Sequence, residues 1–136
     1  MLQDAEISIG LNSDTFILAD SQELAERLHA ETDLRVKSHL ASYASIEGFP
    51  PPDVVLNILY TLAPLLADVY LNVVSSALYD AMKAAFSRQG KPDSEATFYL
   101  ARRDDVGNVV REVRGQTSDR EIIKGLIRQA SEDDET

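Results

Sequence analysis

Residues 53–88 read DVVLNILYTLAPLLADVYLNVVSSALYDAMKAAFSR, and this stretch decides the fold of the 136-residue chain. It contains no glycine and one proline, Pro64, and most of its side chains are apolar. So long a run without a break predicts a single helix over 53–88. Pro64 lacks a backbone donor and clashes with the preceding turn, so we expect a kink there. Two separate helices, over 53–62 and 64–88, are the alternative.

The polar residues of this stretch form only a narrow stripe on the predicted helix. At about 100° per residue the stripe is roughly 60° wide, and it consists of Asn57, Thr61, Asp68, Asn72 and Ser75. A helix with so little polar surface must be covered on two sides. We expect the sheet to cover one side, and two shorter helices or a second protomer to cover the other.

A transmembrane helix fits this stretch poorly. A span needs about 20 mainly apolar residues, whereas Asp68 interrupts the apolar run. A charged residue in mid-span costs roughly 2.5–3.5 kcal/mol on insertion scales. No basic cluster flanks either end of the stretch. We therefore expect no membrane association.

Strand-like and helix-like patterns alternate before the long stretch. Apolar and polar residues alternate over 7–11, which predicts a strand with one buried face. Residues 15–19 are rich in β-formers and predict a second strand, completing an N-terminal hairpin. Asp20 has capping-box spacing with a following glutamate, so a short amphipathic helix is expected over 21–31. Renewed alternation predicts a strand over 34–43.

The region after the long stretch predicts a hairpin and a final helix. Glycine and proline within 89–93 end the preceding helix. The β-rich segments 96–103 and 109–114 are separated by five residues that include a glycine, which predicts an antiparallel hairpin. A capping box at 118–121 begins an amphipathic helix that ends near residue 131.

Together these elements predict a single α+β domain over 1–131, followed by an acidic disordered tail over 132–136. The expected architecture is a small, mostly antiparallel sheet packed on a long, Pro-kinked central helix with two shorter helices. The expected order is β(β)αβ-α-ββα. The prolines at 50–52 separate the N-terminal elements from the long helix.

Charge and composition restrict the partners of the chain. The formal net charge is −10, and residues 1–52 hold nine acidic against three basic side chains, a net of −6. Nucleic acid is disfavoured as the main partner, because phosphate binding needs clustered lysine and arginine. The chain has no cysteine, and the first residues lack the pattern of a secretory signal. We expect a cytoplasmic protein.

No catalytic or metal-binding motif is recognisable in the sequence. His29 and His39 lack a carboxylate at ligand spacing and are expected to be structural or surface residues. We therefore expect no enzyme activity, no catalytic residue, no cofactor and no metal. A small-ligand pocket beside Asn57, Asp68 and Asn72 is a further alternative.

Interface candidates lie on the long helix and on the C-terminal hairpin. Tyrosine suits half-wet protein interfaces, and arginine recognises carboxylates and phosphates. The candidates are Tyr60, Asp68, Tyr70, Asn72, Tyr79, Arg102, Arg111 and Arg114. For the arginines, cross-strand charge pairing is the structural alternative.

The segment ELAERLHAETDLR at 23–35, which enters a strand, is followed by a proline-marked loop, a long apolar helix, a glycine-containing hairpin and a terminal helix. This layout resembles the effector-associated constant component domains of bacterial conflict systems over nearly the whole chain. The resemblance implies a non-enzymatic accessory module that couples to an effector such as a protease or a nucleotide-dependent switch. It implies no catalytic residue.

Two functions follow as expectations from the sequence. The first is a non-enzymatic protein–protein interaction or adaptor module of a bacterial defence or signalling system, which acts through another protein or self-association at the 53–88 helix. The alternative is an acidic immunity-type protein that neutralises a basic toxin, and it rests on the acidic N-terminal region.

Overall fold

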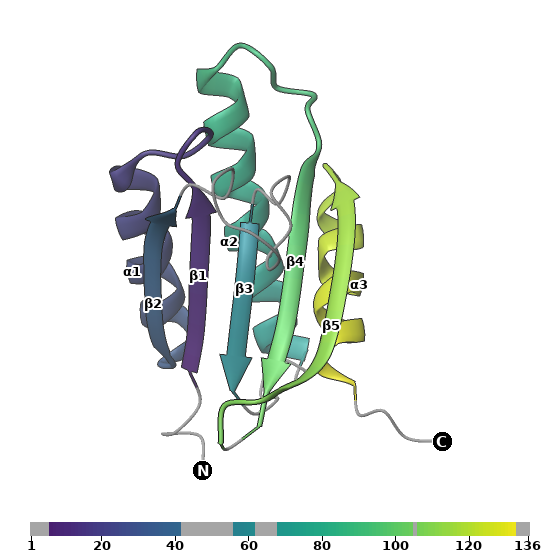
Figure 1. Cartoon of the computed structure of the whole chain (residues 1–136). Coiled ribbons are helices and arrows are strands. Elements are labelled where there is room, and N and C mark those ends of the chain that lie inside the picture. Colours follow the sequence, from purple (N-terminus) through teal and green to yellow (C-terminus); the bar gives the residue numbers. More distant parts are fainter. Residues whose placement is uncertain (1–5, 42–55, 62–67, 105, 133–136) are drawn as a thin grey trace.

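A computed structural model describes residues 6–41, 56–61, 68–104 and 106–132. Within these residues, three helices lie against one face of a five-stranded sheet (Figure 1). The elements follow in the order β1 (Glu6–Asn12), α1 (Leu18–Thr32), β2 (Arg35–Ala41), β3 (Leu56–Thr61), α2 (Asp68–Arg88), β4 (Ala96–Arg103), β5 (Val109–Thr117) and α3 (Arg120–Ser131).

The sheet is mixed, with the strand order β2-β1-β3-β4-β5. β1 pairs with β2 and β3 pairs with β4 in parallel, and each pair is connected through a helix, α1 or α2. The pairs β1–β3 and β4–β5 are antiparallel. The α+β class is confirmed, but the expectation of a mostly antiparallel sheet is wrong, because two strand–helix–strand units require parallel neighbours.

The core lies between the sheet and the three helices. Ile9 of β1 and Ile58 of β3 are direct partners in the sheet, and both are fully buried. From the helix side, Leu78 of α2 and Ile127 of α3 are equally buried. Gly115 of β5 permits the close approach of α3, since a Cβ there would lie 2.7 Å from a methyl carbon of Leu126.

The prediction of a single long helix over 53–88 is wrong. Its first part contains the strand β3, which lies in the middle of the sheet, and α2 begins only at Asp68. The alternative with a helix over 53–62 fails for the same reason, since Leu56–Thr61 is extended. The expected kink at Pro64 and the proline loop at 50–52 lie outside the described residues.

The predicted polar stripe is also not formed. Asn57 is on β3 and therefore belongs to a different element from Asn72. Ser75 is buried, and its hydroxyl donates to the carbonyl of Leu71 at 2.6 Å. The stripe fails because its five positions were placed on one helix, whereas two of them, Asn57 and Thr61, lie on a strand.

The N-terminal hairpin is replaced by a turn and an early helix start. Residues 13–15 form a turn, and α1 begins at Leu18 instead of residue 21. Asp20 lies in the first turn of α1 and accepts a hydrogen bond from the backbone amide of Ile17 at 2.9 Å. Asp20 is therefore the third residue of α1, whereas the prediction placed it at the N-cap position before the helix. This explains why the predicted start of the helix is three residues late.

The C-terminal half agrees with the sequence analysis. The predicted strand 96–103 coincides with β4, and β5 pairs with it as an antiparallel hairpin. β5 extends three residues beyond the predicted end at 114. α3 is capped by Asp119, whose carboxylate accepts from the backbone amide of Glu121 at 2.7 Å. Residues 133–136 of the predicted tail are outside the described range.

The opposite face of the sheet also contains buried side chains. Thr97, Tyr99 and Ala101 alternate with the core residues of β4, and each is less than one-tenth exposed. Burial raises the pKa of Tyr99 above its ordinary range, and the charge of Glu112 adds to this effect.

Among the helices described, none is long and apolar enough to cross a membrane.

Candidate functional site

The five interface candidates assigned to the long helix are divided between two elements. Tyr60 is on β3, where its register partners are on β1 and β4, so it belongs to the centre of the sheet. Asp68 is the first residue of α2. Tyr70 and Tyr79 are half-buried against the core, and Asn72 between them is exposed. Four of the five candidates therefore lie on α2, and Tyr60 lies on the strand β3.

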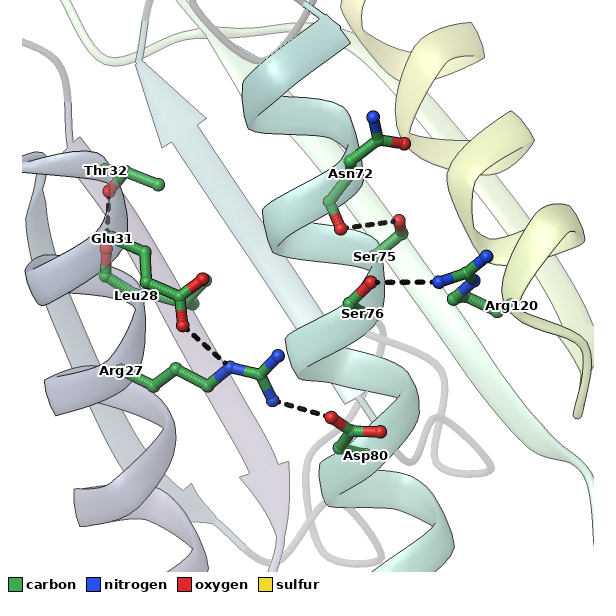
Figure 2. Close-up of polar contacts among 9 residues, drawn as sticks. All are labelled: Arg27, Leu28, Glu31, Thr32, Asn72, Ser75, Ser76, Asp80 and Arg120. Atoms are coloured by element: carbon green, nitrogen blue, oxygen red, sulfur yellow. Dashed lines mark hydrogen bonds and ion pairs between the residues drawn. The ribbon is translucent and has the colours of Figure 1, made fainter.

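Arg27 of α1 connects the first two helices. Its Nη1 lies 2.7 Å from the Asp80 Oδ2 of α2, and its Nε lies 3.0 Å from the Glu31 Oε2 one turn later in α1 (Figure 2). The hydrogen bond to Asp80 raises the pKa of Arg27 further above its ordinary value. The side chain of Arg27 is 36% exposed and that of Asp80 is 60% exposed. Such surface pairs are worth about 0–1 kcal/mol, so a ligand can rearrange them at small cost.

Arg120 of α3 approaches α2 from the other side. Its Nη1 lies 3.4 Å from the Ser76 hydroxyl, and its Nη2 lies 3.4 Å from the Glu121 carboxylate. Both distances are long for charge-assisted hydrogen bonds, and the side chain is 55% exposed. Figure 2 shows the guanidinium groups of Arg27 and Arg120 directed toward α2 from opposite sides, where Ser76 and Asp80 are one turn apart.

These side chains surround a cavity of about 700 Å³ on the helix-covered side of the molecule. We call it the three-helix cleft, and its lining residues are Arg27, Ser76, Tyr79, Asp80, Ser118, Asp119 and Arg120. The cleft combines two arginines and one tyrosine, the residue types that contribute most to binding hot spots. Its carboxylates and hydroxyls provide acceptors for a partner's donors. The arrangement suits the recognition of a polar protein surface.

The hairpin arginines lie on opposite sides of the sheet. Arg102 and Arg111 are direct cross-strand partners, and like charges in this position repel each other. Both reach the C-terminal end of α3, where Arg111 Nε donates to the Gln129 carbonyl at 2.7 Å. Arg102 Nη2 donates to the Glu132 carbonyl at 3.4 Å. The negative end of the helix dipole stabilises both charges, so these two arginines have a structural role.

Arg114 is three positions from Arg111 on β5, so its side chain lies on the other face of the sheet. It lies opposite Tyr99 and is exposed. It borders a small cavity of about 250 Å³ together with Thr97 and Gln116. The eight interface candidates are therefore divided among several elements, and of those whose side chains the structure describes, Tyr79 alone borders the three-helix cleft.

The loop between β4 and β5 is held by one side chain. Asp104 Oδ1 accepts from the backbone amides of Val106 at 3.0 Å and Asn108 at 2.9 Å. Gly107 adopts a φ of 93°, which glycine allows without strain. The loop presents Val106, which is 79% exposed, and the neighbouring Val109 and Val110 are also exposed.

We predict that Asp104→Ala lowers the free energy of unfolding by about 1–2 kcal/mol, because two backbone amides lose their acceptor. Asp104→Asn retains an acceptor oxygen and is expected to lose less than half as much. Urea denaturation followed by circular dichroism measures both values. Faster amide hydrogen exchange at Val106 and Asn108 in the alanine variant would locate the effect in the loop. Equal stability of the two variants would contradict the prediction.

His29 and His39 are not part of a group of possible metal ligands in the described part of the chain. His29 Nδ1 lies 2.8 Å from the Leu34 carbonyl, so this ring helps to close the end of α1. His39 is exposed on β2. Over residues 6–41, 56–61, 68–104 and 106–132, no group of three or more histidine, aspartate or glutamate side chains could hold a metal ion.

Sequence reasoning missed the two arginines of the cleft. Arg27 and Arg120 are 93 positions apart in the chain, and the capping box that contains Arg120 indicates a helix start and not a binding site. They meet α2 because α1 and α3 both pack beside it on the same face of the sheet (Figure 1). Only this topology brings them to one cavity.

Comparisons with protein families, curated proteins and solved structures find no match to this chain.

Proposed function

We propose that this protein is a non-enzymatic protein–protein interaction module that binds its partner through the three-helix cleft. The observation that supports this function is the placement of Arg27, Tyr79 and Arg120, from three different helices or their flanks, around a cavity of about 700 Å³. Arginine and tyrosine combine a large contact area with several hydrogen bonds, and they are enriched where binding energy is concentrated.

The arginines of the cleft can exchange hydrogen-bond partners within the chain for partners on another protein. Arg120 makes only long contacts in the free protein, so a carboxylate on the partner offers it a shorter and stronger bond. Arg27 already shares its charge between Asp80 and Glu31 and is held in position by them. A partner with an exposed acidic side chain therefore has two guanidinium groups to bind, of which only that of Arg27 already has short contacts.

The resemblance described above favours a biological setting for this module. It points to an adaptor or accessory component of a bacterial defence or signalling system, located in the cytoplasm. In that setting the partner is an effector, such as a protease or a nucleotide-dependent switch. The module would position or regulate the effector by contact alone.

An acidic immunity-type protein is the second candidate function. Glu23, Glu26 and Glu31 are all exposed on α1, and they provide a negative surface for a basic toxin. This function predicts binding that weakens strongly between low and high salt, because electrostatic attraction is screened. A pull-down at the two salt concentrations tests this prediction. Binding to a neutral partner that is insensitive to salt would contradict the immunity function.

The test of the interaction module uses partners encoded by neighbouring genes, co-expressed with the full chain. We expect Arg120→Glu to weaken the complex by about tenfold or more, since it places a carboxylate where the partner's carboxylate binds. Lys91→Glu makes the same kind of charge reversal at an exposed position after α2, outside the cleft, and is expected to leave the affinity unchanged. Isothermal titration calorimetry measures both affinities.

The same variants can also contradict the proposed binding site. Arg120 is more than half exposed and has only long contacts, so Arg120→Glu should not unfold the protein. Equal affinities of the Arg120→Glu and Lys91→Glu variants would exclude the cleft as the binding site. A strict monomer at high concentration in light scattering, with no neighbour-encoded protein bound, would contradict the function itself.

A further inference from the structure

The outer edge of β2 lies beside a groove that is separate from the three-helix cleft. In the part of the sheet that the structure describes, β2 is an edge strand that pairs with β1 alone. Its side chains Arg35, Lys37 and His39 are exposed on the face away from the helices. An edge strand presents alternate backbone amide and carbonyl groups to an incoming strand.

The groove runs between this edge and the outer side of α1. Its volume is about 520 Å³, and we call it the β2 groove. Its lining includes Leu18, Ala25, Glu26, Val36 and Ser38. Leu18 is 60% exposed, an unusual amount for a leucine in the first turn of a helix. The groove thus offers three apolar side chains, and its polar lining residues are Ser21, Gln22, Glu26, Lys37 and Ser38.

A hydrogen bond connects α1 and β2, the two walls of the groove, and fixes the distance between them. The Ser21 hydroxyl of α1 donates to the Ser38 hydroxyl of β2 at 2.8 Å, and Ser21 is buried. Side chains on the helix-facing side of β2 alternate with the exposed basic ones, because successive residues of a strand point to opposite faces. A strand added to β2 would therefore place every second side chain over the groove.

We propose that the β2 groove binds an extended peptide segment of another protein by strand addition, with alternating apolar and acidic residues. The peptide's backbone bonds to the edge of β2, its apolar side chains enter the groove beside Leu18 and Ala25, and its acidic side chains face Arg35 and Lys37. Peptide-binding domains commonly combine a strand edge with pockets for alternate side chains in this way.

Charge selects this occupant over the alternatives. Lys37 contacts Glu6 at 3.3 Å, but its side chain is 68% exposed and remains accessible to a second carboxylate. Glu26 at the border of the groove disfavours acidic side chains on that side, which leaves the apolar ones to face it. A second copy of the chain is disfavoured, since antiparallel pairing of two β2 strands places Arg35 and Lys37 near the same charges of the partner copy.

The probe is a blocked, fluorescein-labelled peptide of alternating glutamate and valine with the seven-residue length of β2. A peptide of alternating lysine and valine is its control. We expect the glutamate peptide to bind about tenfold more tightly in fluorescence anisotropy, since two favourable charge pairs replace two repulsive ones. Its amide chemical-shift changes should concentrate on residues 35–40 and on the first two turns of α1.

Two variants test the two sides of the proposed site. Arg35→Glu with Lys37→Glu is expected to reverse the preference in favour of the lysine peptide, and Leu18→Ser is expected to weaken both peptides by about threefold to tenfold. All three positions are exposed, so the variants should fold. Lys91→Glu, far from β2 in the chain, and Arg120→Glu in the three-helix cleft should leave peptide binding unchanged, which separates this proposal from the proposed function.

Three outcomes would overturn the proposal. The first is a glutamate peptide that binds no more tightly than the lysine peptide, including the case that neither binds. The second is a set of chemical-shift changes outside β2 and α1. The third is a dimer in light scattering that the Arg35→Glu, Lys37→Glu variant dissociates, because this would make a second copy the occupant of the edge.

Discussion

Phe98→Ala is expected to lower the free energy of unfolding by about 3–5 kcal/mol, the range for removing a large buried aromatic side chain. Phe98 is fully buried on β4, whose neighbours β3 and β5 flank it on both sides. Its helix-facing side belongs to the core formed with the three helices. The surrounding strands are hydrogen-bonded to one another and cannot collapse into the space left by the ring. The cavity therefore persists and adds to the lost transfer free energy.

Such a loss is large compared with the total stability of a domain, about 5–15 kcal/mol. Urea or guanidinium denaturation, followed by far-ultraviolet circular dichroism, measures it. Phe98→Leu retains much of the volume and is expected to lose about 1–2 kcal/mol. Val110→Ala on β5 serves as an exposed control and should change stability by less than about 0.5 kcal/mol. A Phe98→Ala loss below about 1 kcal/mol would mean that β4 is not the centre of the core.

Asp20→Ala is expected to lower the free energy of unfolding by about 2–3 kcal/mol, because one buried carboxylate satisfies two separate groups. Asp20 is 9% exposed. One of its oxygens, Oδ2, accepts from the Ile17 amide at the start of α1 and also lies 2.7 Å from Arg88 Nη2. The other, Oδ1, accepts from Arg88 Nη1 at 3.3 Å. The alanine variant leaves the first turn of α1 without its acceptor and removes the tie to the last turn of α2.

Two further variants divide these contributions. Asp20→Asn retains an acceptor for the Ile17 amide but loses the charge pair, so we expect an intermediate loss. Arg88→Ala removes the other member of the pair, whose side chain is 40% exposed and can return to water. It should therefore cost less than Asp20→Ala. A double-mutant cycle with both alanine variants measures the coupling directly. Strict additivity of the two losses would show that the observed ion pair contributes nothing to stability.

The sequence analysis was most accurate where local signals determine the structure. The hairpin of β4 and β5 follows from two β-rich segments separated by a glycine-containing loop, and both strands have the predicted identity. α3 follows from its capping residues and its apolar period, although its cap is Asp119, one residue after the start of the predicted capping box at 118–121. The strand β1 follows from strict alternation over 7–11. In each case, neighbouring residues contain the required information.

The helix predicted over Leu56–Thr61 is wrong because the local signals there are ambiguous. A short run of apolar residues has the same appearance in a buried helix and in a strand covered on both faces. β3 lies between β1 and β4, with strands on both sides. Its extended conformation depends on hydrogen bonds to residues far away in the chain. The proline three residues after Thr61 was the available signal against a continuous helix, and the continuity of the apolar pattern outweighed it.

The candidate site was even less accessible to sequence reasoning. Tyr79 was a predicted interface residue, and it does border the three-helix cleft. Its neighbours Arg27 and Arg120 have no distinguishing sequence context. Conversely, Arg102 and Arg111 resembled a surface for anions, but their guanidinium groups bind carbonyls at the end of α3. A residue type indicates what a side chain is able to bind, whereas its available partners depend on the packing of distant elements.

The sequence by itself determined the elements whose patterns are local: the strand β1, the hairpin of β4 and β5, the capped helix α3, and the apolar content that requires a large core. The tertiary structure alone decided that the region 53–88 is divided between a central strand and a helix, and that three helices meet around one cleft. The physical reason is the range of the interactions. Caps, turns and alternation act over a few residues, whereas strand pairing and cavity formation join groups that only the folded chain brings together.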